Sequence, residues 1–412
     1  MIPEGWEEKH LGDCIATSMA GEWGGVSQED ECDIPVLRST NFTNSGVIDY
    51  SSIAIRNIPK RKIHAKCLVA GDILLEKSGG SPKQPVGRVV YFESHKSFLY
   101  SNFIQKLTPA SSCDNKYFFY KLFFEYQNGF VLKYQQQTTG IINFQLAEFL
   151  LAKGNFPPLP EQKKIAAILT SVDEAIEKQQ AQISKLQDLK KAMMQELLTK
   201  GIGHTEFKDS LVGRIPKGWE CCLLDEVARR GSGHTPNKQI PEYWNGGIHW
   251  VSLADSFQLD TRYIIETDKN ISELGIKNSS AVLHPKGTVV LSRDAGIGKS
   301  TTLGLDMAVS QHFIAWVCGK KLNNFFLYYL LQLWKPKFEA VAMGSTIKTI
   351  GLSYFKKLQI PVPCVEEQQQ IVSTLTSIDD NIEIKQKKLA QSKSLKKSLM
   401  QDLLTGKVRV PC

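Results

Sequence analysis

The sequence predicts an α/β (α+β) protein built from two tandem, pseudo-symmetric halves. In each half a mixed, β-rich domain is followed by a long helix, and the two helices are expected to pair as an antiparallel coiled coil. Three observations predict this arrangement. One long segment occurs twice in the 412 residues, each copy has a heptad pattern, and the blocks before the copies contain short alternating strands.

The repeated segment is the strongest signal in the chain. Residues 160–199 (PEQKKIAAILTSVDEAIEKQQAQISKLQDLKKAMMQELLT) occur again as residues 366–405 at an offset of 206 without a gap. From Glu161 to Thr199, 18 of 39 positions are identical. Weaker similarity precedes each copy, because NKYFFYKL at 115–122 resembles NNFFLYYL at 323–330. The chain therefore contains two similar half-units.

Both copies have the spacing of a coiled-coil helix. Apolar residues alternate at four- and three-residue steps, and Gln179 and Lys190 (with Lys385 opposite Gln179 in the alignment) fill polar positions. Prolines precede both copies, and Gly201 and Gly406 stand where left-handed C-caps are expected. The apolar positions are Ile165, Leu169, Val172, Ile176, Ile183, Leu186, Met193 and Leu197, then Ile371, Leu375, Ile378, Ile382, Leu389, Leu399 and Leu403.

A single apolar stripe would also fit the core-facing side of a surface helix. Two copies of matching length instead favour pairing with each other. Because a globular block separates them, the simplest arrangement is an antiparallel pair with one block at each end. At 1.5 Å per residue each helix is roughly 58 Å long.

The blocks before the helices, roughly residues 1–156 and 202–360, read as β-rich. AGDILLEKSG (70–79) and KGTVVLSRDAGIG (286–298) combine a turn with alternating apolar residues, which predicts strand entry. VGRVVYF (86–92) and HFIAWVCG (312–319) predict further strands. Aromatic stretches at 117–126 and 325–334 are expected to be helical. We therefore expect a mixed domain with a twisted sheet, open or barrel-like, in each half.

Composition narrows the class of protein only slightly. Lys and Arg number 50 against 42 Asp and Glu, which is compatible with a polyanionic partner such as DNA. The nine cysteines form no C-x-x-C pair, so no zinc site or other metal site is predicted. The start, MIPEGWEEKH, has no signal-peptide pattern and no stretch is long enough to span a bilayer, so a cytoplasmic protein is expected.

Two catalytic motifs are approached but not matched. AGIGKST (295–301) resembles a phosphate-binding loop, yet the required first glycine falls on Arg293. An amino-methyltransferase needs Asn or Asp before Pro-Pro-aromatic, whereas residues 155–158 read Asn-Phe-Pro-Pro. We therefore predict that the chain is not an enzyme and has no catalytic residues. The loop SRDAGIGKS is open to two interpretations, a DNA-facing loop or a plain loop with solvated charges.

The chain resembles the specificity subunits of type I restriction–modification systems. GHTPNKQIPEYWNGGIHWVS (233–252) is similar to the stretch that opens a target-recognition domain in that family, with His234 in place of the second glycine. GSTIKTIGLSYFKKLQIPVP (344–363) and TTGIINFQLAEFLLAKGNFPPLPEQKKI (138–165) resemble the family's junction between that domain and the conserved helix. The resemblance covers essentially the whole chain.

The resemblance implies the organisation and partners of the protein. It implies target-recognition domains at 1–156 and 202–360 and conserved helices at 157–201 and 361–406. Each domain would read one half of a split, asymmetric site in double-stranded DNA, and the helices would set the distance between the halves. Two methyltransferase (M) subunits would dock on the helices, and restriction (R) subunits would join through the complex. No cofactor is expected on this chain, because S-adenosylmethionine and ATP would bind the partner subunits.

Candidate DNA contacts are polar and basic residues of the two blocks, since Lys and Arg suit phosphates and polar side chains suit base edges. PKRKIHAK (59–66) is the densest basic run of the first block. The candidates are Arg38, Asn41, Arg56, Lys60, Arg61, Lys62, Lys77, Lys83, Arg88, Gln137 and Thr138, then Thr235, Tyr243, Trp244, Ser252, Arg262, Arg293, Lys299, Ser345 and Lys348.

Two other functions stay open on the residues alone. One is a coiled-coil scaffold or adaptor that joins two protein-binding domains without DNA. The other is an enzyme in its own right, an NTPase or a solitary methyltransferase. DNA binding that weakens steeply with salt would favour a DNA reader over a scaffold, and methyl transfer by the chain alone would favour an enzyme.

Overall fold

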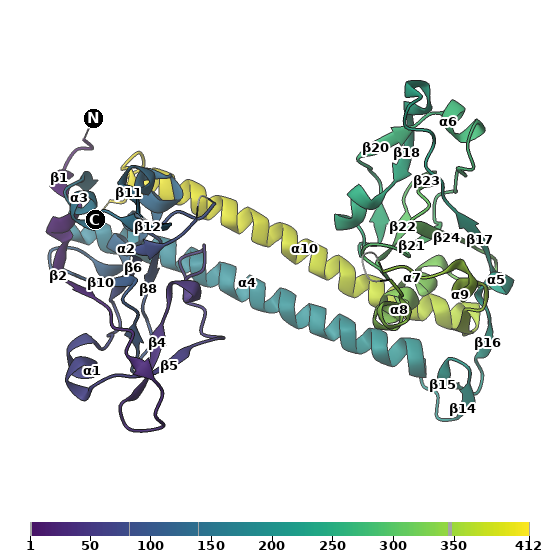
Figure 1. The fold of residues 1–412 in the computed structure, drawn as a ribbon, viewed down its shortest axis with the longest axis horizontal. Helices are drawn as coiled ribbons and strands as arrows, with labels where there is room; N and C mark the ends of the chain where they lie inside the picture. Colours follow the sequence, from purple (N-terminus) through teal and green to yellow (C-terminus); the bar gives the residue numbers. More distant parts are fainter. Residues whose placement is uncertain (1, 82, 139, 345–347, 412) are drawn as a thin grey trace. The chain divides into compact units, whose positions relative to one another are not determined.

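The computed structural model describes residues 2–81, 83–138, 140–344 and 348–411, and it divides into two compact units (Figure 1). Unit 1 comprises Met1–Gln180 and Lys387–Cys412, and unit 2 comprises Ala181–Gln386. Each unit therefore contains one β-rich domain, half of the first long helix and half of the second. Within the described ranges no helix is long and apolar enough to cross a membrane.

Unit 1 contains the first thirteen strands of the chain. The strands are β1 Glu7–His10, β2 Ile15–Ala20, β3 Gly25–Val26, β4 Asp33–Leu37, β5 Ala54–Asn57, β6 Ile73–Glu76, β7 Ser78–Gly79, β8 Val89–Tyr91, β9 Leu99–Tyr100, β10 Ile104–Pro109, β11 Gln135–Thr138, β12 Ile141–Phe144 and β13 Lys153–Phe156. The α-helices are α1 Lys60–Lys66, α2 Asn115–Gln127, α3 Leu146–Leu150 and the start of α4 Leu159–Lys200; short 3₁₀ turns cover Leu11–Cys14, Ser39–Asn41 and Phe130–Tyr134.

The sheets of unit 1 surround a buried central strand. The order β2-β10-β6-β8 forms one four-stranded sheet and β3-β5-β4-β9 a second, while β11-β12-β7 and β1-β13 are smaller. All four residues of β6 are buried. The aromatic helix α2 covers this strand's sheet and shares one core with Ile165 and Leu169 of α4 and with Met400 and Leu403 of α10 (Val365–Leu404). The domain is thus built onto both long helices.

Unit 2 repeats this plan with different loops. The strands are β14 Phe207–Ser210, β15 Gly213–Pro216, β16 Glu220–Leu223, β17 Ala228–Ser232, β18 Trp244–Val251, β19 Tyr263–Ile264, β20 Lys269–Ile271, β21 Val289–Ser292, β22 Ser300–Leu303, β23 Ala308–Val309, β24 Phe313–Cys318 and β25 Gln359–Val362. The α-helices are α5 Leu224–Val227, α6 Glu273–Lys277, α7 Asn324–Leu333, α8 Lys335–Val341, α9 Leu352–Lys356 and the start of α10; 3₁₀ turns cover Pro241–Tyr243 and Leu253–Phe257.

The central sheet of unit 2 has the order β17-β24-β21-β22-β19, and β20-β18-β23 forms a second sheet. β21 is fully buried, as β6 is in unit 1. The aromatic helix α7 packs in one core with Trp316 of β24, with Leu197 of α4 and with Ile371 and Leu375 of α10. The strands and the aromatic helices that the sequence predicts are present in both units.

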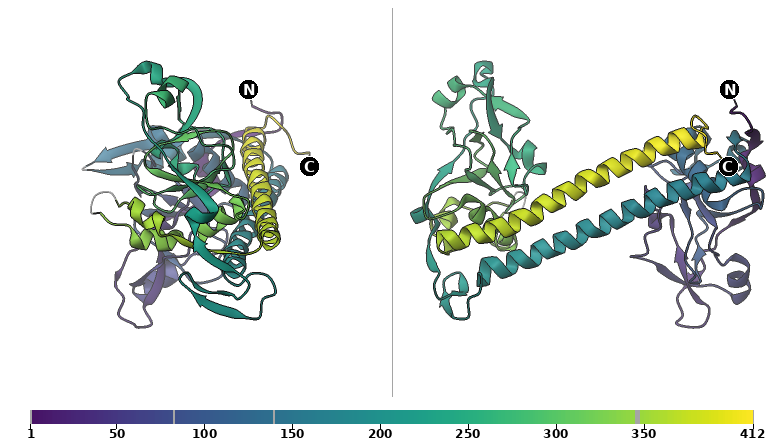
Figure 2. Two further views of the ribbon diagram at one scale, coloured as in Figure 1. Left: turned by 90° about the vertical axis from the view of Figure 1, so that its right-hand side faces the viewer. Right: turned by 180° about the vertical axis from the view of Figure 1, so that it is seen from behind.

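The two long helices pair antiparallel within each unit. In unit 1, Gln179 of α4 donates to Ser392 of α10 at 3.1 Å, and in unit 2, Lys385 of α10 donates to Gln182 of α4 at 2.8 Å. Figure 2 shows the end of α10 beside the start of α4. The predicted apolar positions form the buried or half-buried stripe of both helices. Gly201 and Gly406 follow the helices with φ of 68° and 74°, which confirms the predicted left-handed caps.

A buried carboxylate ties the segments that meet at the start of α4. Glu161 is 2% exposed; it accepts hydrogen bonds from the Trp6 indole and from the Arg409 guanidinium at 2.8 and 2.9 Å. The backbone N–H of Val410 donates to the same carboxylate. The hydrogen-bonded Arg409 lowers the pKa of the Glu161 carboxyl. The segment that follows α10 therefore completes unit 1.

The equivalent carboxylate in unit 2 is Glu367 at the start of α10. It accepts from the Trp219 indole at 3.0 Å, from His204 Nε2 at 2.9 Å and from the backbone of Ile202 at 2.9 Å. Here the segment after α4 supplies the partners that the segment after α10 supplies in unit 1. The duplication therefore extends to the contacts that hold each domain on its helices.

Replacing Arg409 with alanine is expected to destabilise unit 1 by about 1–3 kcal/mol, because it removes charge-assisted hydrogen bonds from a buried carboxylate. Thermal denaturation would measure the loss of stability, and hydrogen exchange of unit 1 peptides would show that the loss lies in unit 1. Lys407→Ala is the matched control, because Lys407 is exposed and forms a surface ion pair with Asp402 near the end of α10. Equal stability of the two variants would contradict a structural role for Arg409.

Candidate nucleic-acid interface

A basic residue stands at the end of the buried central strand in each unit. Lys77 follows β6, and Arg293 follows β21. The backbone N–H of Phe144 donates to the Lys77 carbonyl at 2.8 Å, and the N–H of Ile350 donates to the Arg293 carbonyl at 2.9 Å. Phe144 and Ile350 are themselves separated by the repeat offset of 206. The two basic residues therefore occupy equivalent positions.

Both cationic groups are partly withdrawn from water. Lys77 is half-buried, and burial, together with the nearby Lys66, lowers the pKa of its ammonium group. The Arg293 side chain is 21% exposed, and its Nε is buried without a hydrogen-bond acceptor. A partly buried cation is stabilised more strongly by a nearby anion than a fully solvated cation is. A phosphate group or the edge of a guanine base would provide hydrogen-bond acceptors for these two cations.

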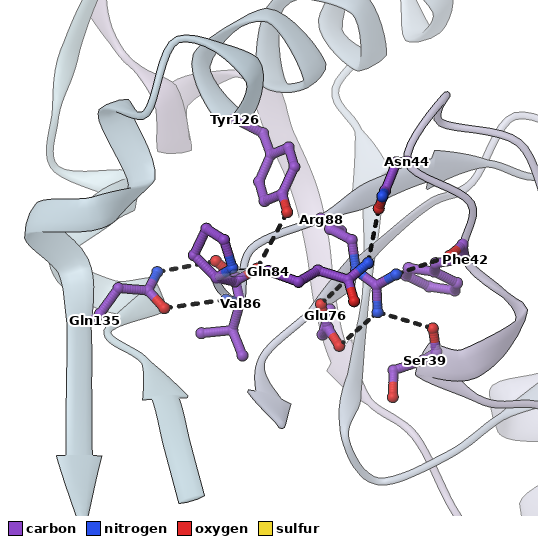
Figure 3. A network of polar contacts seen from close by, with 10 residues as sticks. Ser39, Phe42, Asn44, Glu76, Gln84, Val86, Arg88, Tyr126 and Gln135 are labelled. Atoms are coloured by element: carbon purple, nitrogen blue, oxygen red, sulfur yellow. Dashed lines mark hydrogen bonds and ion pairs between the residues drawn. The ribbon is translucent and has the colours of Figure 1, made fainter. Parts of the chain in front are cut away.

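In unit 1 a buried network shapes the loops beside Lys77 (Figure 3). Arg88 donates to Glu76 through Nε at 2.8 Å and Nη2 at 2.9 Å, and it also donates to the carbonyls of Phe42 and Ser39. Glu76 is the last residue of β6 and is 1% exposed. Arg88 therefore holds the loop at 39–44 against β6, the strand that precedes Lys77.

Side-chain amides hold the next loop in the same region. Gln135 bridges to the backbone N–H and carbonyl of Val86 at 3.0 and 2.9 Å, and Gln84 donates to Asn44 at 2.7 Å (Figure 3). Gln135 begins the β11-β12 hairpin, whose exposed side chains include Gln137. Lys83 is exposed on the loop before Gln84. Side-chain amides therefore hold the loops beside β6, and Lys83 and Gln137 are exposed on those loops.

In unit 2 the corresponding region contains a carboxylate and a histidine. Asp294 accepts a hydrogen bond from His312 Nδ1 at 2.7 Å and another from the Thr349 hydroxyl, and Arg293 Nε lies 3.7 Å from its Oδ1. Asp294 and His312 meet because β21 and β24 are antiparallel neighbours, with Ser292 opposite Phe313. Asp294 is therefore held by two hydrogen bonds and lies beside the Arg293 guanidinium.

His312 is held in one orientation by Asp294 at one ring nitrogen and lies next to Gln311 at the other. Because a carboxylate only accepts, Nδ1 carries the proton and Nε2 is the acceptor of the neutral ring. The amide nitrogen of Gln311 lies 3.5 Å from Nε2, and the Gln311 oxygen accepts from the Thr235 hydroxyl. His312 is one-third exposed. Unit 2 therefore presents an amide donor and an imidazole acceptor side by side, groups that suit base edges.

Three predicted contact residues are corrected by the structure. Arg88, Asn41 and Ser252 are buried, and their polar atoms bond within the chain. The Asn41 amide donates to the carbonyls of Asp49 and Ser52 at 2.9 Å, and Ser252 caps a 3₁₀ turn and bonds to Asp255. These side chains hold loops in place, and their burial prevents contact with DNA in this conformation.

Most other candidates of unit 1 bond to neighbouring groups of the chain. Arg56 stacks on Trp23 at 4.5 Å and donates to its carbonyl, and Arg38 donates to the Ser52 carbonyl. On α1, Lys60 pairs with Glu31 and Lys62 pairs with Glu22, while Arg61 is exposed. The basic run 59–66 is therefore partly neutralised by neighbouring acids. The side chain of Thr138 lies outside the described residues.

Candidates of unit 2 divide in the same way. Trp244 packs edge-on against Trp250 at 5.2 Å, and Tyr243 is half-buried beside Gly275. Arg262 pairs with Asp380 of α10, and Lys299 donates to the Ser256 carbonyl at 2.9 Å. Three candidates lie close to Asp294 or to the residues that bond to it: Thr235, Arg293 and Lys348. Lys348 is exposed. Ser345 lies outside the described residues.

Several residues of this region were missed by the sequence analysis. They are Asn44 and Gln84 in unit 1 and Asp294, Gln311, His312 and Thr349 in unit 2. Aligning β6 with β21 would have placed Lys77 with Arg293, and the 206 offset would have brought residues near 144 and 350 beside them. His234 also has ordinary backbone geometry and donates its N–H to the Val309 carbonyl at 3.0 Å, so the turn does not need a second glycine.

The comparison with known families fits this duplicated arrangement. A model of the family described as "Type I restriction modification DNA specificity domain" matches residues 3–187 and again residues 216–393. The two matches cover most of the chain, one in each half. The chain belongs to the type I restriction–modification specificity subunits.

Known specificity subunits resemble the chain along nearly its whole length. The type I restriction enzyme MjaVIII specificity subunit of Methanocaldococcus jannaschii is 30% identical over 422 residues, covering 99% of this chain and 94% of the relative. The crystal structure of the S subunit from M. genitalium has a TM-score of 0.58 at 14% identity, with 98% and 99% of the chains covered. A chain from a type I R-M system structure has a TM-score of 0.57 at 15% identity, with 99% and 100% covered. These two likenesses support the fold of this specificity subunit.

Among the residues that the structure describes, no group of three His, Cys, Asp or Glu side chains is placed to hold a metal ion. The eight cysteines within those ranges are free thiols.

Proposed function

We propose that this specificity subunit reads a two-part, asymmetric sequence in double-stranded DNA, one part with each unit. The equivalent positions of Lys77 and Arg293 at the ends of the two central strands carry the proposal. Next to these shared cations the loops differ: side-chain amides of Gln84 and Gln135 hold the loops beside β6, whereas Asp294 and His312 lie next to Arg293. A shared basic position with different polar neighbours suits two readers of different sequences.

The partners follow from membership of the family and stay part of the proposal. Two methyltransferase subunits dock on the paired helices, and restriction subunits join through them. S-adenosylmethionine and ATP bind those subunits, in the cytoplasm, while this chain performs no chemistry itself. Its relatives are named as specificity subunits of type I restriction enzymes, which supports this division of labour.

The decisive experiment combines methylome mapping with binding. Adenine methylation in the host genome identifies the target, and duplexes that contain it are titrated with the subunit and its methyltransferase partners at rising salt. Arg293→Ala is expected to weaken binding by about 5- to 150-fold, the range for an arginine that reads a base. Lys77→Ala is expected to weaken binding and lower the salt slope by about one, as a phosphate contact does.

Matched controls distinguish sequence recognition from a nonspecific effect of charge on DNA binding. Lys217→Ala removes a charge from an exposed Lys217–Glu206 pair on the β14-β15 hairpin and should leave target binding unchanged. Gln311→Ala should relax recognition in one half of the methylated motif only. If no duplex binds at low salt, the chain is a scaffold instead of a DNA reader. Methyl transfer by the purified chain alone would contradict its assignment as non-catalytic.

A further inference from the structure

The same three-residue contact occurs where each domain meets the two long helices. In unit 1, the Tyr120 hydroxyl of α2 donates to Asp173 of α4 at 2.8 Å, and Lys396 of α10 lies 2.6 Å from the same carboxylate. In unit 2, the Tyr329 hydroxyl of α7 donates to Asp379 of α10 at 2.7 Å, and Lys190 of α4 lies 2.6 Å from it. We call each of these contacts a Tyr–Asp–Lys tie.

The ties match in their accessory contacts as well. Each tyrosine hydroxyl also lies near a threonine of the helix, Thr170 at 3.3 Å and Thr376 at 3.4 Å. Each lysine ammonium lies over the ring of its tyrosine, at 5.6 Å for Lys396 and 5.5 Å for Lys190. The aspartates, the lysines and the threonines are all separated by 206 residues. The contact has thus been kept in both halves while the surrounding loops differ.

Each tie joins three elements: a helix of the domain, the long helix that follows that domain, and the other long helix. The lysine side chains are 13% and 22% exposed, and the aspartate side chains are 36% exposed for Asp173 and 14% for Asp379, so the ties are partly buried. Partly buried charges lose more when a partner is removed than surface charges do. Any displacement of one long helix along the other would break the ties.

The apolar stripe by itself does not select one alignment. In a heptad repeat, a shift of seven residues places apolar positions opposite apolar positions again. After such a shift in either direction, each charge of the ties would face an uncharged side chain. Asp173 would face Leu389 or Leu403, Lys190 would face Val372 or Gln386, Asp379 would face Ile183 or Leu197, and Lys396 would face Ala166 or Gln180. The ties therefore penalise every one-heptad slip.

We propose that the two Tyr–Asp–Lys ties are positioning contacts that fix the register of α4 against α10 and pass it to the domains through Tyr120 and Tyr329. This inference rests on the proposed function where it concerns DNA. A slip of one heptad moves one helix by about 10 Å along the other. At about 3.4 Å per base pair, the preferred spacing between half-targets would change by about three base pairs.

The register is tested by cross-linking in the full-length chain. Cysteines at Gln179 and Ser392, which are in hydrogen-bond contact, report the native register. Gln179→Cys combined with Lys385→Cys or Leu399→Cys reports a slip of one heptad in either direction. Linked peptides are identified by mass spectrometry. D173K/D379K should reduce the native link by about threefold or more and produce a slipped link, because both ties then oppose like charges.

Two further variants make the result decisive. D173K/K396D/D379K/K190D reverses both ties and should restore the native link. E174K/E177K makes the same charge change on neighbouring exposed positions of α4 and should leave the native link at its original yield. If D173K/D379K fails to fold, D173N/D379N replaces it. A native link at the unmodified level in the folded acid-replaced variant would overturn the proposal.

The second readout is the spacing of the DNA target. The subunit with its methyltransferases is assayed on the mapped target with its natural spacer and with spacers three base pairs longer and shorter. D173K/D379K should gain methylation on an altered spacer, and the four-residue reversal should return the preference to the natural one. A loss of activity on all spacers in equal proportion would indicate a purely structural role. If the unmodified complex reads no two-part target, the proposed function fails, whereas cross-linking still decides the register.

Discussion

Replacing Arg88 with alanine is expected to destabilise unit 1 by about 3–5 kcal/mol, because it leaves the Glu76 carboxylate buried and unpaired. Glu76 is 1% exposed, and both of its oxygens accept from the Arg88 guanidinium. The carbonyls of Phe42 and Ser39 lose their donor in the same substitution. The loop beside Lys77 should therefore loosen together with the sheet.

Hydrogen exchange resolves this effect by unit. Peptides of β6 and β8 should lose protection in Arg88→Ala, while peptides of unit 2 serve as an internal reference. Arg56→Ala is the matched control: Arg56 stacks on Trp23 and donates to carbonyls, so its loss leaves no carboxylate unpaired. E76L/R88M should recover much of the stability, since it removes both charges. Arg88→Ala with the protection of the unmodified protein would show that the ion pair contributes little.

Gly233→Ala is expected to lower the free energy of unfolding by about 3 kcal/mol, because the added methyl group has no space. It should also displace the residues around Asp294. A Cβ at Gly233 would overlap the backbone carbonyl oxygens of Val309 and Ser310, at the end of β23. The backbone of Gly233 is not left-handed, so the cost is steric. The displaced segment carries Thr235, whose hydroxyl bonds to Gln311.

The same close approach occurs in unit 1 and provides a second test. A Cβ at Gly21 would overlap the carbonyls of Tyr100 and Ser101, so Gly21→Ala should destabilise unit 1 to a similar degree. Gly218→Ala is the control, since nothing lies within 4 Å of its Cβ. Thermal denaturation measures stability, and binding to the mapped target measures the loss at the interface. Equal behaviour of Gly233→Ala and Gly218→Ala would refute the steric argument.

The sequence was most informative where it was repeated or periodic. The long helices follow from heptad spacing and duplication, because an apolar stripe has to be buried wherever it occurs. β6 and β21 follow from short apolar runs after a glycine turn, which are typical of a fully buried strand. These signals are local, so they do not depend on how the loops are arranged.

The side chains of the interface depend on tertiary contacts. Lys77 and Arg88 are both basic residues of one short stretch, yet only Arg88 is buried, because Glu76 lies within its reach. Asp294 and His312 are brought together by the pairing of β21 with β24. Arg262 was predicted to contact DNA, whereas in the structure it pairs with Asp380 of α10. Composition and spacing carry no information on such choices.

The composition of the two units has a consequence for how the protein is made. Unit 2 is one continuous stretch, Ala181–Gln386, whereas unit 1 needs residues from Lys387 onward. At about 5–20 residues per second, a ribosome takes roughly 10–40 s to synthesise the intervening stretch. During that time Met400 and Leu403, which share one core with Ile165 and Leu169, have not yet been synthesised. Unit 1, which begins earlier in the chain, is therefore completed after unit 2, and its nascent part exposes an apolar surface to chaperones until Met400 and Leu403 have been synthesised.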